Sequence, residues 1–170
     1  EQMAQRLEIV SAERIRAELE RLLLSPYPRR GLELLVHTGI CDIVLPEVSA
    51  LQDTVDEHRR HKDVYEHTLT VLQQAMDLET GPDGAVPGPD LRLRLAALMH
   101  DIGKPATRRF MPDGTVTFHA HDYVGARMTA KRMRALHFDK QTIKDVSRLV
   151  ELHLRFHGYA DSPWSDSAVR

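Results

Sequence analysis

Apolar residues recur at helical spacing along most of this 170-residue chain, and this pattern predicts an all-α protein. Ser11 is the expected N-cap of a first helix over residues 11–24, and Gly39 is the expected stop of a second. Further helical patterns cover residues 63–79, 91–100, 121–137 and 139–157. His67 and His153 are expected to lie in the middle of two of these helices.

The interruptions between these patterns are turn signals and charged stretches. Residues 80–90 combine three glycines with three prolines and predict a loop. Pro112-Asp113-Gly114 predicts a small β-hairpin within residues 107–119, and Pro46 is expected to end a short apolar segment at residues 41–47. The fold class predicted is therefore a helical bundle with one small hairpin.

Composition excludes several classes of protein. The single cysteine, Cys41, excludes a disulfide framework and a cysteine-only zinc cluster. A net charge of −2 gives no global signal for nucleic-acid binding. No apolar run has the length of a membrane span and no signal-peptide pattern opens the chain, so we expect a cytoplasmic protein without membrane contact. Because the chain begins at Glu1 without an initiator Met, we expect it to be a piece of a longer protein.

Candidate chemistry concentrates at the sequence His100-Asp101-Ile102-Gly103-Lys104, which follows a dense apolar stretch. Adjacent residues diverge on an intact helix, so the helix must end or distort here for both side chains to reach one ion. We expect Gly103 to supply that freedom and Pro105 to stop the helix from continuing. Taken alone, a polar C-terminal turn explains this segment more simply.

Histidines elsewhere in the pattern change that interpretation. His67, His121 and His153 would each come from a different helix, and with His100-Asp101 they could meet at one centre. A mixed set of imidazoles and carboxylate suits Mn, Fe, Co, Ni or Zn, and suits Mg less well. Each histidine singly is more simply a core residue, but together they favour a metal site.

These residues resemble the HD-domain superfamily of metal-dependent phosphohydrolases, in the order His67, then His100-Asp101 with Gly103-Lys104. The resemblance implies one ion held by His67, His100 and Asp101, and a second that shares Asp101 with two later histidines. His121 and His153 are the expected pair, with His119 as the alternative to His121.

The same resemblance implies a reaction and assigns catalytic roles to Asp101 and Lys104. A metal-activated water would attack a phosphomonoester or a 2′,3′-cyclic phosphate. The superfamily pattern closes with a late Asp, and neither Asp161 nor Asp166 matches its position. We therefore expect that the HD domain is truncated at its C-terminus.

A narrower resemblance, to bacterial and especially actinobacterial CCA-adding tRNA nucleotidyltransferases and poly(A) polymerases, covers nearly the whole chain. It rests on separate motifs in order: SAERI at residues 11–15, LPE at 45–47, FHAHD at 118–122 and LHLRFHGY at 152–159. It implies neck and body helices at residues 1–52, an HD domain at 53–170, and tRNA, RNA 3′ ends or phosphorylated nucleotides as partners. The nucleotidyl-transfer head, with its glycine-rich motif and paired aspartates, has no counterpart in this sequence.

Two alternatives to the enzyme hypothesis stay open. The chain could be a non-catalytic helical body that binds RNA and carries a structural metal, or a free-standing HD nucleotide phosphohydrolase. Candidate phosphate contacts are basic pairs and runs, each of which could equally be a solvated face: Arg59, Arg60, Lys62, Arg108, Arg109, Lys131 and Arg134.

Overall fold

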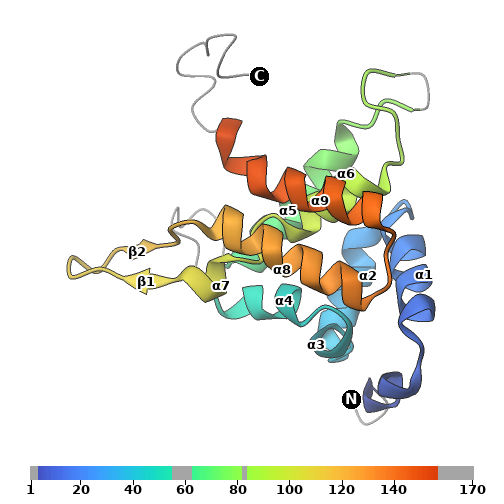
Figure 1. Ribbon diagram of the computed structural model, residues 1–170, viewed down its shortest axis with the longest axis horizontal. Helices are drawn as coiled ribbons and strands as arrows, with labels where there is room; N and C mark the ends of the chain where they lie inside the picture. The colour runs from blue at the N-terminus through green and yellow to red at the C-terminus, as the bar shows by residue number, and fades with distance from the viewer. Residues whose placement is uncertain (1–3, 55–62, 82–83, 157–170) are drawn as a thin grey trace.

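The structure, a computed structural model, describes residues 4–54, 63–81 and 84–156 (Figure 1). The N-terminal part contains the 3₁₀ helix η1 (Ala4–Ile9), α1 (Ala12–Leu23), α2 (Pro28–His37), α3 (Cys41–Val44), α4 (Pro46–Ser49) and η2 (Ala50–Asp53). The rest contains α5 (Val64–Asp77), α6 (Leu91–Met99), α7 (Lys104–Thr107), α8 (His121–Ala135), α9 (Lys140–Leu152) and η3 (His153–Phe156).

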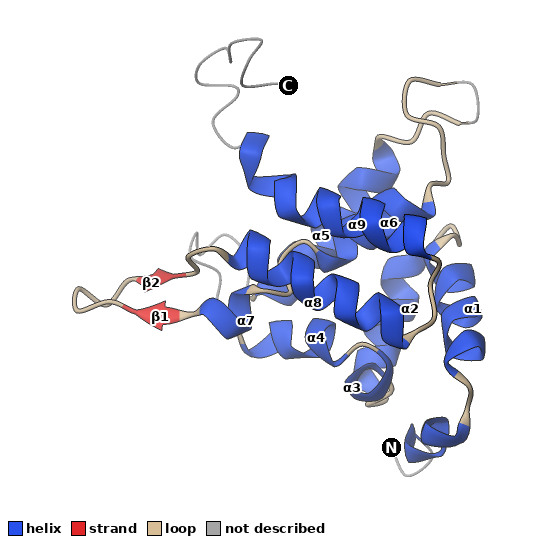
Figure 2. Ribbon diagram, viewed as in Figure 1, coloured by secondary structure: helices blue, strands red, loops and turns tan. Residues whose placement is uncertain are grey.

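The strands are confined to one hairpin, β1 (Arg109–Phe110) and β2 (Val116–Thr117), which pair antiparallel with Arg109 opposite Thr117 (Figure 2). The predicted all-α fold with one small hairpin is confirmed. Among the described helices, none has both the length and the apolar character that a bilayer crossing would require.

Capping residues set the helix boundaries much as the sequence predicted. Ser11 Oγ accepts a hydrogen bond from the backbone N–H of Arg14 at 3.4 Å, at the start of α1. Asp139 accepts one from the N–H of Thr142 at 2.9 Å, at the start of α9. Gly39 has a φ of +74° just after α2, which is a left-handed stop that glycine adopts without strain.

Three boundary predictions were wrong. Pro46 begins α4 rather than ending a segment, because a proline in the first helical turn sacrifices no intrahelical hydrogen bond. Pro105 likewise lies in the first turn of α7, and α6 has already ended at Met99. His153 is not in the middle of a helix, since α9 ends at Leu152 and His153 begins the tighter η3.

One apolar core runs through both halves of the chain. α6 packs against α5 on one side and α9 on the other, and α8 lies along α9 (Figure 1). The core cluster includes Leu19 and Leu23 of α1 together with Leu72, Leu98 and Val150 of the later helices. The division into residues 1–52 and 53–170 remains a prediction, and the core extends across it.

Arg94 is a charged side chain on the buried surface of α6, with 5% of its area exposed. Its Nε donates to Glu79 Oε1 at 2.9 Å, and its Nη1 donates to the carbonyls of Leu23 at 2.6 Å and Ser25 at 3.0 Å. The hydrogen bond from Arg94 lowers the pKa of Glu79. The guanidinium therefore joins the end of α1, the segment after α5 and the middle of α6.

We predict that Arg94→Ala lowers the free energy of unfolding by about 3–5 kcal/mol, because it leaves the buried Glu79 carboxylate without its partner. Arg92→Ala is the matched control on the same helix, since its ion pair with Asp145 is partly exposed, with 48% and 31% of the two side chains accessible to solvent. It should cost no more than about 1 kcal/mol. Urea unfolding measures both variants, and equal losses would contradict this account.

Candidate metal centre

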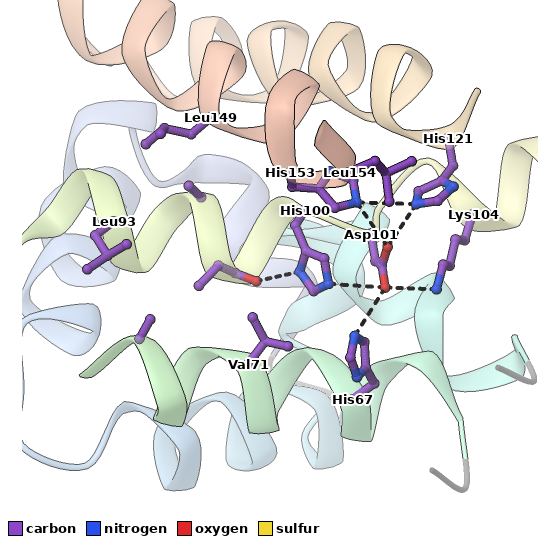
Figure 3. A pocket seen from close by; sticks show the side chains of 13 residues that line it. His67, Val71, Leu93, His100, Asp101, Lys104, His121, Leu149, His153 and Leu154 are labelled. Atoms are coloured by element: carbon purple, nitrogen blue, oxygen red, sulfur yellow. Dashed lines mark hydrogen bonds and ion pairs between the residues drawn. The ribbon is translucent and has the colours of Figure 1, made fainter. Parts of the chain in front are cut away.

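The turn after α6 brings His100 and Asp101 to the same side of the chain (Figure 3). The α-helical hydrogen bonding stops here, since the N–H of Ile102 bonds to the carbonyl of Met99 at 3.3 Å and that of Lys104 to Asp101 at 2.9 Å. Both side chains are buried, with 8% of His100 and 2% of Asp101 exposed. The predicted end of the helix at this point is therefore observed.

Gly103 is needed here for a reason other than the predicted backbone freedom. Its φ of −77° is open to any residue. A Cβ on Gly103 would lie 2.1 Å from the carbonyl oxygen of His121 and 2.7 Å from the backbone nitrogen of Gly125. The turn therefore packs directly on the backbone of α8, and this close approach fixes where α8 presents His121.

The Asp101 carboxylate lies between two pairs of histidines, with one oxygen toward each pair (Figure 3). Its Oδ2 is 3.1 Å from Nε2 of His100 and 3.7 Å from Nε2 of His67. Its Oδ1 is 3.2 Å from Nε2 of His121 and 3.8 Å from Nε2 of His153. Within each group of three residues, the potential ligand atoms lie within 4.8 Å of one another. The structure thus brings all five predicted metal-site residues together, from α5, the turn after α6, α8 and η3.

Backbone carbonyls set the orientation of three of these imidazoles. Nδ1 of His100 lies 2.9 Å from the carbonyl of Ala97, and Nδ1 of His121 lies 2.8 Å from that of Phe118. The third, Nδ1 of His153, lies 2.6 Å from the carbonyl of Val150. A carbonyl only accepts, so each Nδ1 donates, and in the neutral ring Nε2 then carries a lone pair toward the centre. Metal-binding histidines commonly have this arrangement.

The donor atoms fit a cation. Nε2 of His121 and Nε2 of His153 are 3.3 Å apart, so either a proton on one ring or a cation between the two rings must separate their lone pairs. Asp101 Oδ2 is buried, with Nε2 of His100 and Nζ of Lys104 each 3.1 Å away. A buried carboxylate beside several imidazole nitrogens is a mixed donor set that suits a borderline transition metal.

The pKa shifts of Asp101, His121 and His153 show which of these groups are charged. Burial opposes ionisation of Asp101, but hydrogen bonds from His100 and His121 outweigh it and hold its pKa well below the ordinary value. Burial lowers the pKa of His153 to about 4, so this ring is neutral at physiological pH. Burial also opposes the charged form of His121, but its hydrogen bond to Asp101 prevails and raises its pKa. The centre therefore has a permanent anion among rings that can act as ligands.

Lys104 belongs to the same cluster. Its Nζ is 3.1 Å from Asp101 Oδ2 and lies 5.4 Å from the centre of the Phe118 ring. The side chain is 5% exposed, so it is directed inward rather than into solvent. This position suits a lysine that orients the Asp101 carboxylate better than one that contacts a phosphate.

A cavity of about 410 Å³ adjoins the centre. One end holds the histidines, Asp101 and Lys104, and the other is apolar, with Val71 of α5, Leu93 of α6 and Leu149 of α9 among its lining (Figure 3). The apolar end and the carbonyls behind the imidazoles were not predicted. A carbonyl partner has no signature in the sequence, since every residue carries one.

None of the other predicted residues that the structure describes belongs to either group of potential ligands. His119 is exposed and belongs to neither group of potential ligands, which supports the choice of His121. Arg108 donates to the carbonyl of Asp53 at 3.0 Å, its guanidinium carbon lies 5.5 Å from the centre of the Phe110 ring, and Arg109 is exposed beside it. Two others, Lys131 and Arg134, are exposed on α8. The predicted contacts Arg59, Arg60 and Lys62 lie outside the described residues, as do Asp161 and Asp166.

A helical bundle with histidines and a His-Asp pair around one cavity is the architecture of an HD domain, and the comparison with known families agrees. The chain belongs to the HD domain family, whose sequence model matches residues 64–167. A second family model, described as the probable RNA and SrmB-binding site of polymerase A, matches residues 1–51. The resemblance to tRNA nucleotidyltransferases is confirmed by the curated relatives.

The curated relatives include two tRNA nucleotidyltransferases and a multifunctional CCA protein. The chain is 38% identical to an A-adding tRNA nucleotidyltransferase of Deinococcus radiodurans over 89% of its own length and 33% of the relative's. It is 38% identical to a CC-adding tRNA nucleotidyltransferase of Thermus thermophilus, over 84% and 31% of the two chains. A multifunctional CCA protein of Neisseria gonorrhoeae is 32% identical, over 86% and 33%. The chain thus spans about a third of the length of these relatives.

We predict that Gly103→Ala lowers the free energy of unfolding by about 1–3 kcal/mol, because its Cβ would overlap the α8 backbone. The variant should also bind divalent metal more weakly, since His121 must move. Gly125→Ala is the control on the facing helix, where the nearest atom is 3.3 Å from the added Cβ. A helix-propensity gain of about 1 kcal/mol should offset that tight contact. Urea unfolding and metal titration test both, and a Gly103→Ala variant that matches Gly125→Ala would refute the packing argument.

Proposed function

We propose that this chain carries a divalent-metal phosphohydrolase site that acts on phosphomonoesters or 2′,3′-cyclic phosphates at RNA 3′ ends. We also propose that it represents the neck, body and HD region of a tRNA nucleotidyltransferase-like protein. The observation that carries the first proposal is the shared Asp101 carboxylate, with one oxygen toward His67 and His100 and the other toward His121 and His153.

His67, His100 and Asp101 would hold one ion, and Asp101 with His121 and His153 would hold a second. Mn, Fe, Co, Ni and Zn suit these donors, and Mg is less suited to so many nitrogens. Bound divalent ions would supply Lewis acidity toward a phosphate oxygen. They would also acidify a water, so that its hydroxide form is available to attack the phosphorus. The protein's own side chains and carbonyls would fix the positions of the two ions and of their ligands. Asp101 separates the two positions, the backbone carbonyls aim the imidazoles, and Lys104 holds the carboxylate and offsets part of the charge.

The cavity supports a substrate that is anionic at one end and apolar or flat at the other. Its polar groups lie at the metal end, while the α5, α6 and α9 side offers aliphatic side chains. A terminal ribose phosphate with its base satisfies both ends. Two of the relatives are tRNA nucleotidyltransferases, which supports an RNA 3′ end as the source of that group.

The wider proposal concerns the parent protein. Residues 1–52 would be neck and body helices that contact RNA, residues 53–170 would form the HD domain, and the cytoplasm would be the location. The two family matches, at residues 1–51 and 64–167, support this division.

We predict that the purified protein contains a divalent transition metal and that Asp101→Ala removes nearly all of it, because both positions share this carboxylate. His121→Ala should remove the ion on one side only. His119→Ala is the matched control, two residues away and exposed, and should keep the full metal content. Elemental analysis by mass spectrometry gives the ratios, and an Asp101→Ala protein with undiminished metal would rule out the site.

We predict that the metal-loaded protein hydrolyses 2′,3′-cyclic AMP, and that Lys104→Met slows turnover about 10–100-fold while the fold is retained. Lys131→Met, an exposed lysine on α8, is the control and should have parental activity. Product formation followed by chromatography provides the measurement. A fully metal-loaded parent without phosphatase or cyclic phosphodiesterase activity would instead support the non-catalytic helical body.

A further inference from the structure

α8 and α9 form a second concave surface, separate from the cavity at the metal centre. This α8–α9 groove has a volume of about 650 Å³. The basic side chains that line it are Arg127 and Arg134 of α8 and Lys140, Lys144 and Arg148 of α9. The proposed hydrolysis does not use any of them, so the groove needs its own explanation.

The charge of this surface differs from that of the whole chain. Residues 121–152 hold seven basic and four acidic side chains, although the chain carries a net charge of −2. Arg148 is partly neutralised by Glu151 at 3.0 Å. Within the part of the chain that the structure describes, no carboxylate pairs with Arg134, Lys140 or Lys144. Three exposed, unneutralised cations around one groove attract an anion.

The Ser147 hydroxyl on the groove wall is a hydrogen-bond donor without a partner among the described residues. Its Oγ is buried. A buried hydroxyl normally has a partner, so this one is available to an oxygen that enters the groove. A phosphate oxygen would satisfy it.

An aromatic ring stands at one end of the groove. Tyr123 is 55% exposed, and the Arg127 guanidinium lies 5.9 Å from the centre of its ring. An exposed ring beside a cation is a platform on which a nucleobase can stack. A membrane surface would instead require several exposed apolar side chains beside the cations, and Tyr123 is the one large example among the described lining residues.

The cations follow the helices as a series rather than as a compact cluster. Lys140, Lys144 and Arg148 recur every four residues, which is about 6 Å of rise per step along α9. Such a series matches a polymer with repeated phosphates better than a single phosphate group. We propose that the α8–α9 groove binds the phosphodiester backbone of single-stranded RNA, with a base stacked on Tyr123.

One end of the α8–α9 groove lies close to the metal centre. Tyr123 follows His121 by two residues on α8, and Glu151 precedes His153 by two residues at the end of α9. One end of the groove therefore lies beside the helix ends that carry two candidate ligands. The inference that the strand runs toward the centre rests on the proposed function, whereas the RNA-binding groove does not.

The test compares two triple variants of the full chain by fluorescence anisotropy with a short labelled single-stranded RNA. The first neutralises the series, Arg134→Gln, Lys140→Gln and Lys144→Gln. The second keeps the charge, Arg134→Lys, Lys140→Arg and Lys144→Arg. At about 0.1 M salt, neutralisation should weaken binding roughly tenfold or more and reduce the slope of log affinity against log salt by about 2. The charge-keeping variant should stay within about twofold of the parent.

Other outcomes would contradict either the groove proposal or the proposed function. Unchanged affinity and salt slope in the neutralised variant would overturn the proposal, as would binding to phosphatidylserine vesicles or polyglutamate without binding to RNA. Hydrolysis of 2′,3′-cyclic AMP by the neutralised variant should equal that of the parent, because that small substrate does not reach the groove. If the parent hydrolyses nothing but RNA affinity still falls on neutralisation, the proposed function fails and the groove inference stands.

Discussion

The organisation of this domain depends on one buried negative charge, the carboxylate of Asp101. Only 2% of this residue is exposed, and burial alone would favour its neutral form. Hydrogen bonds from His100 and His121 and the charge of Lys104 keep it ionised. Because an isolated charge would be costly here, the side chains around it must be held in place, and the surrounding helices do this.

Each neighbour of the carboxylate reaches it from a different element. α5 supplies His67, α8 begins at His121, and η3, directly after α9, begins at His153. The apolar core fixes these helices relative to one another, while the contact between Gly103 and the α8 backbone sets how closely two of them approach. The same α8–α9 pair presents the basic groove on its other surface, so one packing arrangement orders both the candidate centre and the candidate RNA surface.

The sequence predicted the helical fold and the hairpin, because helical periodicity and turn residues can be recognised in it, and the resemblance to HD domains implied which five residues converge. The sequence did not predict features that depend on three-dimensional contact. Gly103 was expected to give backbone freedom, but its role is set by a carbonyl on a helix eighteen residues later. His153 was placed inside a helix because the apolar period continues through η3, where the backbone tightens. The pairing of Arg94 with Glu79 joins residues fifteen positions apart and likewise has no local signal.

The most direct test of the central claim is an anomalous-difference map from crystals grown with Mn²⁺. The account predicts two peaks, one between Asp101 Oδ2 and the side chains of His67 and His100, and one between Oδ1 and those of His121 and His153. A map without a peak at Asp101, from crystals in which Mn²⁺ is bound elsewhere or not at all, would contradict it.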